Sequence, residues 1–446
     1  MKNFIETIKN IWSIEELRKR ILFTLSLLLV YRLGSFLVLP GVDPSQLDAL
    51  QQQADGGILG LLNMFSGGAF AQASVLALGI MPYISASIVV QLLGLAVPYL
   101  QKLDKEGESG RRKKNQITRY LTVGITLAQA PAYLANLTTQ LPAEAFYLNP
   151  GTFWFTSIVI LITGTMFTMW LGEKITDKGI GNGISLLIMI GIIASLPSSF
   201  AFELSTRLAA EGGGLVMLVV ELAVLLFVIL ISILLVQGTR RIPVQFAKRV
   251  VGNKQYGGVR QYIPLKVNAS GVMPIIFAQA IMFVPITFMG FTESETVGKI
   301  ATALTDISGF TYNLIFALLI VVFTYFYTAI TVNANQMADD MKRNGGFIPG
   351  VKPGKKTAEF IDTVMSRITL PGSLFLALVA ILPAFAMKAG VNTQFAQFYG
   401  GTSLLIMVGV VLDTLQQIES YLLNRHYDGL MKSGRIKGRA GVGASI

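Results

Sequence analysis

The stretch LGIMPYISASIVVQLL at residues 78–93 contains a motif that recurs later in the chain. Its tetrapeptide GIMP, residues 79–82, corresponds to GVMP at residues 271–274, which lies 192 positions further on. The similarity continues beyond each proline, where Ile84 corresponds to Ile276. A tetrapeptide can recur by chance, so the repeat gains weight only if the surrounding sequence follows the same period.

Long apolar runs make up most of the chain. Its 446 residues have a mean hydropathy of +0.60 and 14% charged residues, against about 25% in a typical soluble domain. A transmembrane helix needs about 20 mostly apolar residues to cross roughly 30 Å of hydrocarbon. Ten segments qualify, at residues 21–39, 75–97, 119–138, 152–172, 180–200, 215–236, 271–291, 312–332, 371–388 and 401–422. The composition predicts one polytopic membrane domain rather than several soluble domains.

The ten predicted spans repeat with the period of the tetrapeptide. A shift of 192 residues moves the first span to 213–231, close to the sixth, and the third to 311–330, close to the eighth. Each half then has five spans, and because five is odd, the halves have opposite orientations. In such inverted repeats the working site lies near the midplane between the halves. The predicted fold class is an all-α polytopic membrane protein with ten transmembrane helices in two inverted-topology five-helix halves.

The basic residues predict the topology. Of the 36 Lys and Arg residues, 32 fall in six clusters, at residues 2–20, 102–119, 174–178, 240–266, 342–367 and 425–439. Basic residues accumulate on the cytoplasmic side of membrane proteins, so both termini and four internal loops are predicted to be cytoplasmic. This banding, rather than nucleic-acid binding, explains most of the net charge of +11. Three of the basic loops are nevertheless larger than orientation alone requires.

These signals also predict the domain organisation. Residues 1–20 are charged and amphipathic and contain no apparent cleavable signal, so the first span is expected to stay in the membrane. The predicted parts are this cytoplasmic N-terminus, an N-terminal half at 21–200, a C-terminal half at 215–422 with large basic cytoplasmic loops at 237–270 and 333–370, and a cytoplasmic tail at 423–446.

Residues 56–74 do not fit the pattern of spans. They are apolar but too short and too rich in glycine to cross the membrane, and they directly precede the second span on the outer side. Non-helical backbone at membrane depth is tolerated only inside protein or beside a water-filled cavity. The segment is therefore either a re-entrant surface loop or a movable stopper in a pore.

No set of catalytic residues is visible. The chain has no cysteine and one histidine, His426 in the predicted tail, so no histidine triad and no thiolate metal site are available. Glycine-rich stretches at 179–183 and 350–357 resemble phosphate loops, but neither has the required spacing. We therefore expect no enzyme activity, no cofactor and no metal.

Few charged residues lie within the predicted spans; apart from Arg119 and Lys388 at span ends, they are Arg32, Glu221, Asp413 and Glu419. Ion or proton transport usually requires ionisable groups deep in the helix bundle. Glu221 lies about two turns into its span and Asp413 lies in the middle of its span. Each is either a pairing residue at an interface or part of a carboxylate relay, and its partner could belong to this chain or to another subunit.

Isoleucines occupy the midplane positions instead. Ile80, Ile84 and Ile88 are spaced four apart on one face of the second span, and Ile184 and Ile188 repeat this spacing in the fifth. Such stripes usually mediate packing between helices. They also suit a pore constriction, because a narrow apolar constriction can gate by excluding water.

Six long motifs resemble the bacterial SecY family, whose members are protein-conducting channels. They lie in family order at residues 78–93, 105–120, 170–188, 264–278, 346–372 and 399–406, and the resemblance that they carry extends over nearly all of residues 15–430. The resemblance implies a central hourglass pore between the halves, with a ring of apolar side chains that seals around a translocating chain. It places this ring at Ile80, Ile84, Ile184, Ile188, Ile276 and Ile406.

The same resemblance implies a plug and a lateral gate. The glycine-rich segment becomes the plug beneath the ring, with Leu61, Asn63, Met64, Phe65, Ser66, Gly67 and Gly68 as its residues. The gate opens toward lipid between spans two and three on one side and seven and eight on the other, with Ser85, Ser87, Gln91 and Gln279 as polar seam residues. A polypeptide segment that reaches the gate could enter the lipid, with an insertion free energy of about −0.3 to −0.6 kcal/mol for each Leu or Ile.

The large basic loops are implied to dock the ribosome, including its RNA, or the SecA motor ATPase. The expected docking residues are Arg240, Arg241, Lys248, Arg249, Lys254, Lys342, Arg343, Lys352, Lys355 and Lys356. Lys352 departs from the family, which usually has Arg in this PG-x-R-PG turn. Lys keeps the positive charge but lacks the planar guanidinium of Arg, which can form two parallel hydrogen bonds to one partner. The small membrane subunits SecE and SecG are further partners implied by the resemblance.

The sequence therefore predicts the central subunit of a passive protein-conducting channel in the bacterial plasma membrane. It would pass unfolded, signal-bearing polypeptides across the membrane and release hydrophobic segments into the lipid bilayer, driven by SecA or by the ribosome. One alternative is an inverted-repeat secondary transporter for small solutes, which predicts polar or charged ligands at the midplane. Another is a structural scaffold, which leaves the plug-like segment and the basic loops unexplained.

Overall fold

The computed structural model describes residues 11–47, 50, 60, 63–209, 214–246, 249–251, 254–256, 260–289 and 306–433. Each of the ten predicted spans overlaps one long helix in this part of the chain. These helices are α2 (Glu15–Gly34), α5 (Met81–Ala96), α7 (Glu108–Gln140), α8 (Pro150–Lys178), α9 (Gly183–Ala209), α10 (Gly214–Gln237), α11 (Met273–Met289), α13 (Phe310–Thr331), α15 (Lys355–Lys388) and α17 (Gly401–Ser433). Six of them, namely α8, α9, α10, α13, α15 and α17, are long and apolar enough to cross a membrane by length and composition.

The helix boundaries differ from the predicted spans because hydropathy marks only the apolar part of a helix. α15 begins at Lys355, well before the predicted start at residue 371, and α9 continues past residue 200 to Ala209. The opposite holds for α5, which begins at Met81 rather than at residue 75 because residues 66–80 form successive turns. Pro82 lies in the first turn of α5, where its missing N–H removes no helical hydrogen bond.

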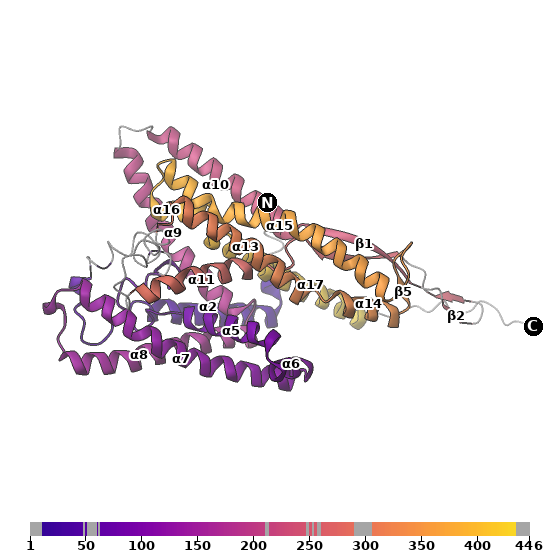
Figure 1. Ribbon diagram of the computed structural model, residues 1–446, viewed down its shortest axis with the longest axis horizontal. Helices are drawn as coiled ribbons and strands as arrows, with labels where there is room; N and C mark the ends of the chain where they lie inside the picture. The colour runs from indigo at the N-terminus through magenta and orange to yellow at the C-terminus, as the bar shows by residue number, and fades with distance from the viewer. Residues whose placement is uncertain are drawn as a thin grey trace, which may run out of the picture.

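Each half packs mainly within itself. In the first half α7 packs against both α5 and α8, and α8 packs against α9. In the second half α13 packs against α11 and α15, and α15 packs against α17. Figure 1 shows α7 and α8 along one edge of the molecule and α10 and α15 along the other, with α2, α5, α11 and α17 between them. The halves meet where α9 packs against α10 and α17.

The loops predicted at 237–270 and 333–370 fold together, so the all-α prediction is incomplete there. β1 (Thr239–Phe246) pairs antiparallel with β4 (Arg260–Lys266), and the short β5 (Gly346–Phe347) pairs with β1 on its other edge. A separate hairpin joins β2 (Arg249–Val251) and β3 (Lys254–Tyr256). In β1, Ile242 and Val244 are buried between exposed neighbours, which is the two-residue alternation of a strand with one covered face.

A small apolar core holds these elements in one unit, which we call the sheet platform. It comprises β1, β4, β5, α14 (Ala334–Arg343) and the first turns of α15. Its core residues are Ile242, Val244, Leu265, Met341, Ile348, Ile361 and Met365. The platform lies at one end of the helix bundle (Figure 1), and we call that end of the molecule the sheet end.

Polar contacts join the two halves at both ends. At the sheet end, the Gly181 N–H, between α8 and α9, donates to Oε1 of Gln417 on α17 at 2.9 Å. At the opposite end, Arg207 Nη2 on α9 donates to Oε1 of Glu221 on α10 at 2.5 Å. The partner of Glu221 therefore lies within this chain, and the contact agrees with the alternative that Glu221 is a pairing residue at an interface. Asp413 is exposed on α17.

Candidate functional site

The six predicted ring residues come together where the two halves meet. Ile80 and Ile84 come from the start of α5, Ile184 and Ile188 from α9, Ile276 from α11 and Ile406 from α17. All six belong to one hydrophobic cluster. Three are almost fully buried, with exposed fractions of 1% for Ile80, 3% for Ile188 and 2% for Ile406, and the other three are half-buried against them.

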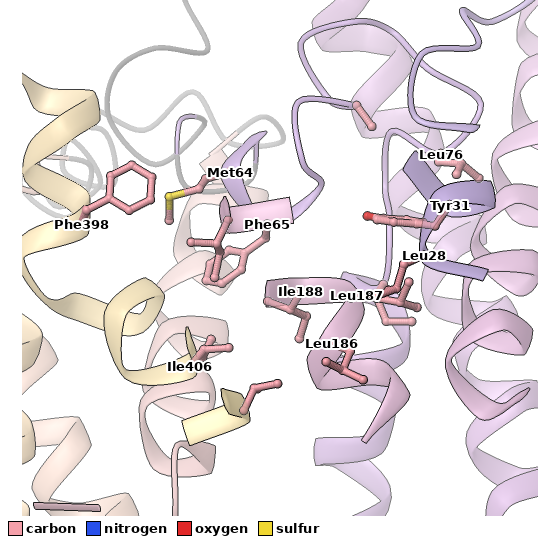
Figure 2. Packing of buried hydrophobic residues seen from close by; sticks show 14 of the residues in the cluster. Leu28, Tyr31, Met64, Phe65, Leu76, Leu186, Leu187, Ile188, Phe398 and Ile406 are labelled. Carbon is pink, nitrogen blue, oxygen red and sulfur yellow. The ribbon is translucent and has the colours of Figure 1, made fainter. Parts of the chain in front are cut away.

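The predicted plug packs directly onto this ring. We use the name for residues 63–74, since Leu61 lies outside the described residues. Met64 and Phe65 are buried in the same cluster as the isoleucines. Figure 2 shows Phe65 close to the space between Ile188 and Ile406, which approach from opposite sides. The structure therefore places the plug and the ring in one continuous apolar contact.

Local hydrogen bonds fold the plug into a compact cap. Residues 63–65 form one helical turn and residues 66–73 form turns. The side chain of Asn63 accepts from the Ala71 N–H at 3.0 Å, and the Ser66 hydroxyl accepts from the Phe70 N–H at 3.0 Å. Gly67 has a φ of +68°, a conformation that L side chains rarely adopt. Gly67 and Gly68, which has a φ of +90°, therefore serve tight turns rather than a continuous helix.

Three side chains donate to backbone carbonyls of the plug. The Tyr31 hydroxyl on α2 donates to the carbonyl of Ser66 at 3.4 Å, and the next residue, Arg32, donates from Nη1 to the carbonyl of Gly67. On the other side, the Tyr133 hydroxyl on α7 donates to the carbonyl of Phe70 at 3.0 Å. Sequence reasoning missed Tyr31 and Tyr133; the only available signal was the unusual charge of Arg32 within a span.

A polar cavity of about 320 Å³ lies on the side of the plug away from the ring. Successive residues of α9 contact the ring, the plug and this cavity in that order. Ile184 and Ile188 belong to the ring, Gly191 contacts the plug, and Ser195 and Ser198 line the cavity. The plug contributes Asn63 and Gln72 to the cavity wall, and the second half contributes Gln394, Gln397 and Phe398. The isoleucine cluster, the plug and the polar cavity therefore follow one another along α9.

The predicted gate residues do not share one site. Ser87 and Gln91 on α5 line a cavity together with Arg111, Lys114 and other residues of α7. Gln279 on α11 is buried and lines a separate small cavity within the second half, beside Tyr312 and Phe316. Ser85 is half-buried on α5 and lines neither cavity. Helical spacing placed Gln279 on the expected helix but did not show which face that residue occupies.

Most of the predicted docking residues lie on the sheet platform. Exposed positions are held by Arg240 and Arg241 on β1, Lys342 and Arg343 at the end of α14, and Lys352, Lys355 and Lys356 around the start of α15. Arg249 and Lys254 belong to the β2–β3 hairpin, and Lys248 lies outside the described residues. Loops that are far apart in the sequence thus present their positive charges on one packed unit.

A sequence model of the SecY family matches residues 74–415 of the chain. The chain belongs to the SecY family. It is 42% identical over 431 residues to the protein translocase subunit SecY of Escherichia coli (strain K12), covering 95% of this chain and 96% of that protein. This agreement over nearly the full length confirms the family resemblance of the six sequence motifs.

Solved structures share the fold of this SecY-family chain at low sequence identity. One concerns the plug domain of the SecY protein, described as stabilising the closed state of the translocation channel and maintaining a membrane seal; its TM-score is 0.61 at 17% identity, with 93% of this chain and 94% of that chain covered. Another is Sec61 in a canine ribosome–channel complex from the endoplasmic reticulum, with a TM-score of 0.59, 17% identity and the same coverage. The fold is therefore that of a polytopic SecY/Sec61 membrane protein, as predicted.

Proposed function

We propose that this chain is the channel subunit of a protein translocase, with the isoleucine ring as its constriction and residues 63–74 as its plug. One observation carries the proposal, namely that Met64 and Phe65 pack onto the ring at the junction of the two halves. Apolar side chains make no lasting hydrogen bond to a passing polypeptide, so they release any sequence, and a narrow apolar constriction excludes water and ions when closed.

The sheet end faces the cytoplasm in this proposal, with both termini on that side and the bilayer being the bacterial plasma membrane. The basic residues of the sheet platform support this orientation. We assign them to docking the ribosome, including its RNA, or a SecA-type ATPase, in line with the ribosome complex of the Sec61 relative. The channel itself is passive and not an enzyme, and SecE and SecG are its proposed small partners.

Lateral release is proposed on the side where α5 and α7 of the first half face α11 and α13 of the second. The hydrogen bonds between the halves involve α9, α10, α17 and the turn before α9 instead. Ser85, Ser87 and Gln91 remain proposed seam residues. Gln279 is a weaker candidate, because it is buried within the second half.

A secondary transporter for small solutes is disfavoured by the ring itself. Such a protein needs polar or charged ligands at the midplane, whereas the six ring positions between the halves are all isoleucine. Glu221 is bonded to Arg207, and Asp413 is exposed on α17. These two carboxylates therefore do not form a relay through the centre.

The decisive experiment traps a secretory polypeptide halfway across the membrane. The chain has no cysteine, so a single Ile276→Cys substitution would report contact with a cysteine placed along the trapped polypeptide. We expect a disulfide that depends on the position of the polypeptide's cysteine. Leu318→Cys, on an exposed face of α13, is the matched control and should not crosslink. If Ile276→Cys crosslinks no better than Leu318→Cys, the ring is only packing and the transporter must be reconsidered.

A further inference from the structure

A group of buried charges joins the halves at the end opposite the sheet platform, and the proposed channel function does not use it. Glu203 and Arg207 lie on α9 and Glu221 on α10, and the two glutamates are 1% and 3% exposed. Arg207 Nε donates to Glu203 Oε1 at 2.9 Å, and its Nη2 donates to Glu221 Oε1 at 2.5 Å. Charged groups are rarely buried so deeply unless they are paired, as these three are.

The two α9 side chains also bind backbone groups of the second half. Arg207 Nη2 donates to the carbonyl of Gly390 at 2.7 Å, and the Asn392 N–H donates to Glu203 Oε2 at 3.0 Å. Both groups belong to the connection between α15 and α17. Hydrogen bonds to charged groups are roughly twice as strong as neutral ones, especially when buried. The first half therefore holds the start of this connection in place.

The anchored connection, residues 390–399, lies against the plug. It contains only α16 (Thr393–Ala396) and the single turn η3 (Gln397–Tyr399), so little regular structure determines its position. Phe395 packs edge-on against Tyr399 at 5.6 Å between ring centroids and against Phe200 of α9 at 5.9 Å. Phe398 belongs to the cluster that contains Met64 and Phe65, and Figure 2 shows its ring directed toward Met64.

We propose that residues 390–399 form a wall that keeps the plug seated on the ring, and that Glu203 and Arg207 are the positioning residues of this wall. Gln394 and Gln397 of the wall face the polar cavity that Asn63 and Gln72 line from the plug side. Displacing the wall opens space next to Met64, into which the plug moves. The inference rests on the proposed function only in calling the segment a plug, because the contact itself is a property of the structure.

The test measures the distance between plug and wall without requiring any transport. Gln72→Cys and Gln394→Cys face the same cavity in a chain that has no other cysteine, so a short bismaleimide reports their proximity in the resting protein. Glu203→Leu is the main variant, because it removes the acceptor for Asn392 and leaves Arg207 and Glu221 as a balanced pair. Arg207→Lys is the second variant. It keeps the positive charge but cannot make all three hydrogen bonds of Arg207, to Glu203, Glu221 and the Gly390 carbonyl.

We expect both variants to shift the equilibrium from seated to displaced plug by roughly tenfold, the effect of losing one hydrogen bond to a charged group. Crosslinking then slows, and ion leak through the resting channel rises. Tyr399→Phe is the matched control, because it removes a buried hydroxyl of the wall that has no hydrogen-bond partner in the structure. Unchanged crosslinking in Glu203→Leu and Arg207→Lys would overturn the proposal, as would an equal loss in Tyr399→Phe. Neither result would bear on whether the ring contacts a trapped polypeptide, so the proposed function is tested independently by the Ile276→Cys crosslink.

Discussion

Gly191 of α9 and Gly67 of the plug touch through their backbones. A Cβ atom added to Gly67 would lie 3.0 Å from the Gly191 Cα, and one added to Gly191 would lie 3.0 Å from the carbonyl oxygen of Phe65. Both distances are shorter than side-chain carbons normally accept, and the opposing atoms belong to backbone. A side chain at either position would therefore require the plug or α9 to give way by a few tenths of an ångström.

Gly191→Ala is expected to lift the plug from the ring and make the resting channel leak ions. The added methyl group would meet the carbonyl oxygens of Met64 and Phe65, so the plug must move away. Ion flux into proteoliposomes containing the purified channel would measure the leak. Gly124→Ala on α7 is the control, because a Cβ there has nothing within 4 Å. A tight Gly191→Ala channel would show that the plug does not depend on this contact.

Arg32→Met is expected to loosen the plug without preventing export. It removes the donor to the Gly67 carbonyl, and with it the guanidinium that lies 4.8 Å from the centroid of the Phe36 ring. The measurement compares export of a precursor that has a weakened signal sequence with export of the normal precursor. We expect the weakened precursor to gain several-fold and the normal one to change little. Lys388→Met, which removes an exposed cation elsewhere, should leave both rates unchanged; equal effects of the two substitutions would refute a specific role for Arg32.

Lys352→Glu is expected to cripple export while the protein remains in the membrane. The side chain is exposed on the sheet platform, and the Lys352 carbonyl accepts from the Thr357 hydroxyl at 3.0 Å, so the turn keeps its shape when the side chain changes. Reversing one charge in a docking surface opposes an acidic or nucleic-acid partner. SecA-driven export into vesicles would measure the loss. Lys178→Glu, exposed at the end of α8 outside the platform, is the control. Normal export by Lys352→Glu would remove this residue from the docking surface.

The loop around Asp43 is expected to lose stability in acid. The Tyr147 hydroxyl donates to Asp43 Oδ2 at 2.7 Å, and the Ser45 N–H and hydroxyl donate to Oδ1 at 2.9 and 2.8 Å. These hydrogen bonds, with that from Tyr147 the largest cause, lower the pKa of Asp43. Stability from a lowered pKa is complete above the unfolded-state value of about 3.9 and disappears as the pH falls through the folded-state value.

The Tm difference between the parent chain and Asp43→Asn measures this contribution across pH. We expect the parent to be more stable near neutral pH and the difference to vanish below the folded-state pKa. Glu144→Gln, which removes an exposed carboxylate between α7 and α8, is the control for the loss of one negative charge. A difference that stays constant down to low pH would mean that the Asp43 carboxylate contributes nothing through its charge.

Much of the architecture could be predicted from the sequence. The positions of the helices follow from apolar run length, and the repeat of residues 79–82 at 271–274 indicated two related halves. The ring residues were implied by the resemblance of the motifs to the SecY family. Strand pairing between β1 and β4 was missed, because a short alternating stretch such as residues 239–246 looks like an ordinary polar loop when charged neighbours dominate it.

The sequence by itself determined the ten helices, which depend on local composition and on spacing along one chain, and its motifs determined the family through their resemblance to known members. Only the tertiary structure decided that Gly67 rests on Gly191, that Arg207 joins Glu203 to Glu221, and that Gln279 is buried away from Ser87. Gly67 and Gly191 lie far apart in the chain, and even the closer pair of Arg207 and Glu221 depends on how α9 and α10 pack. Their partners are selected by packing and by the need to pair buried polar groups, which no local pattern records.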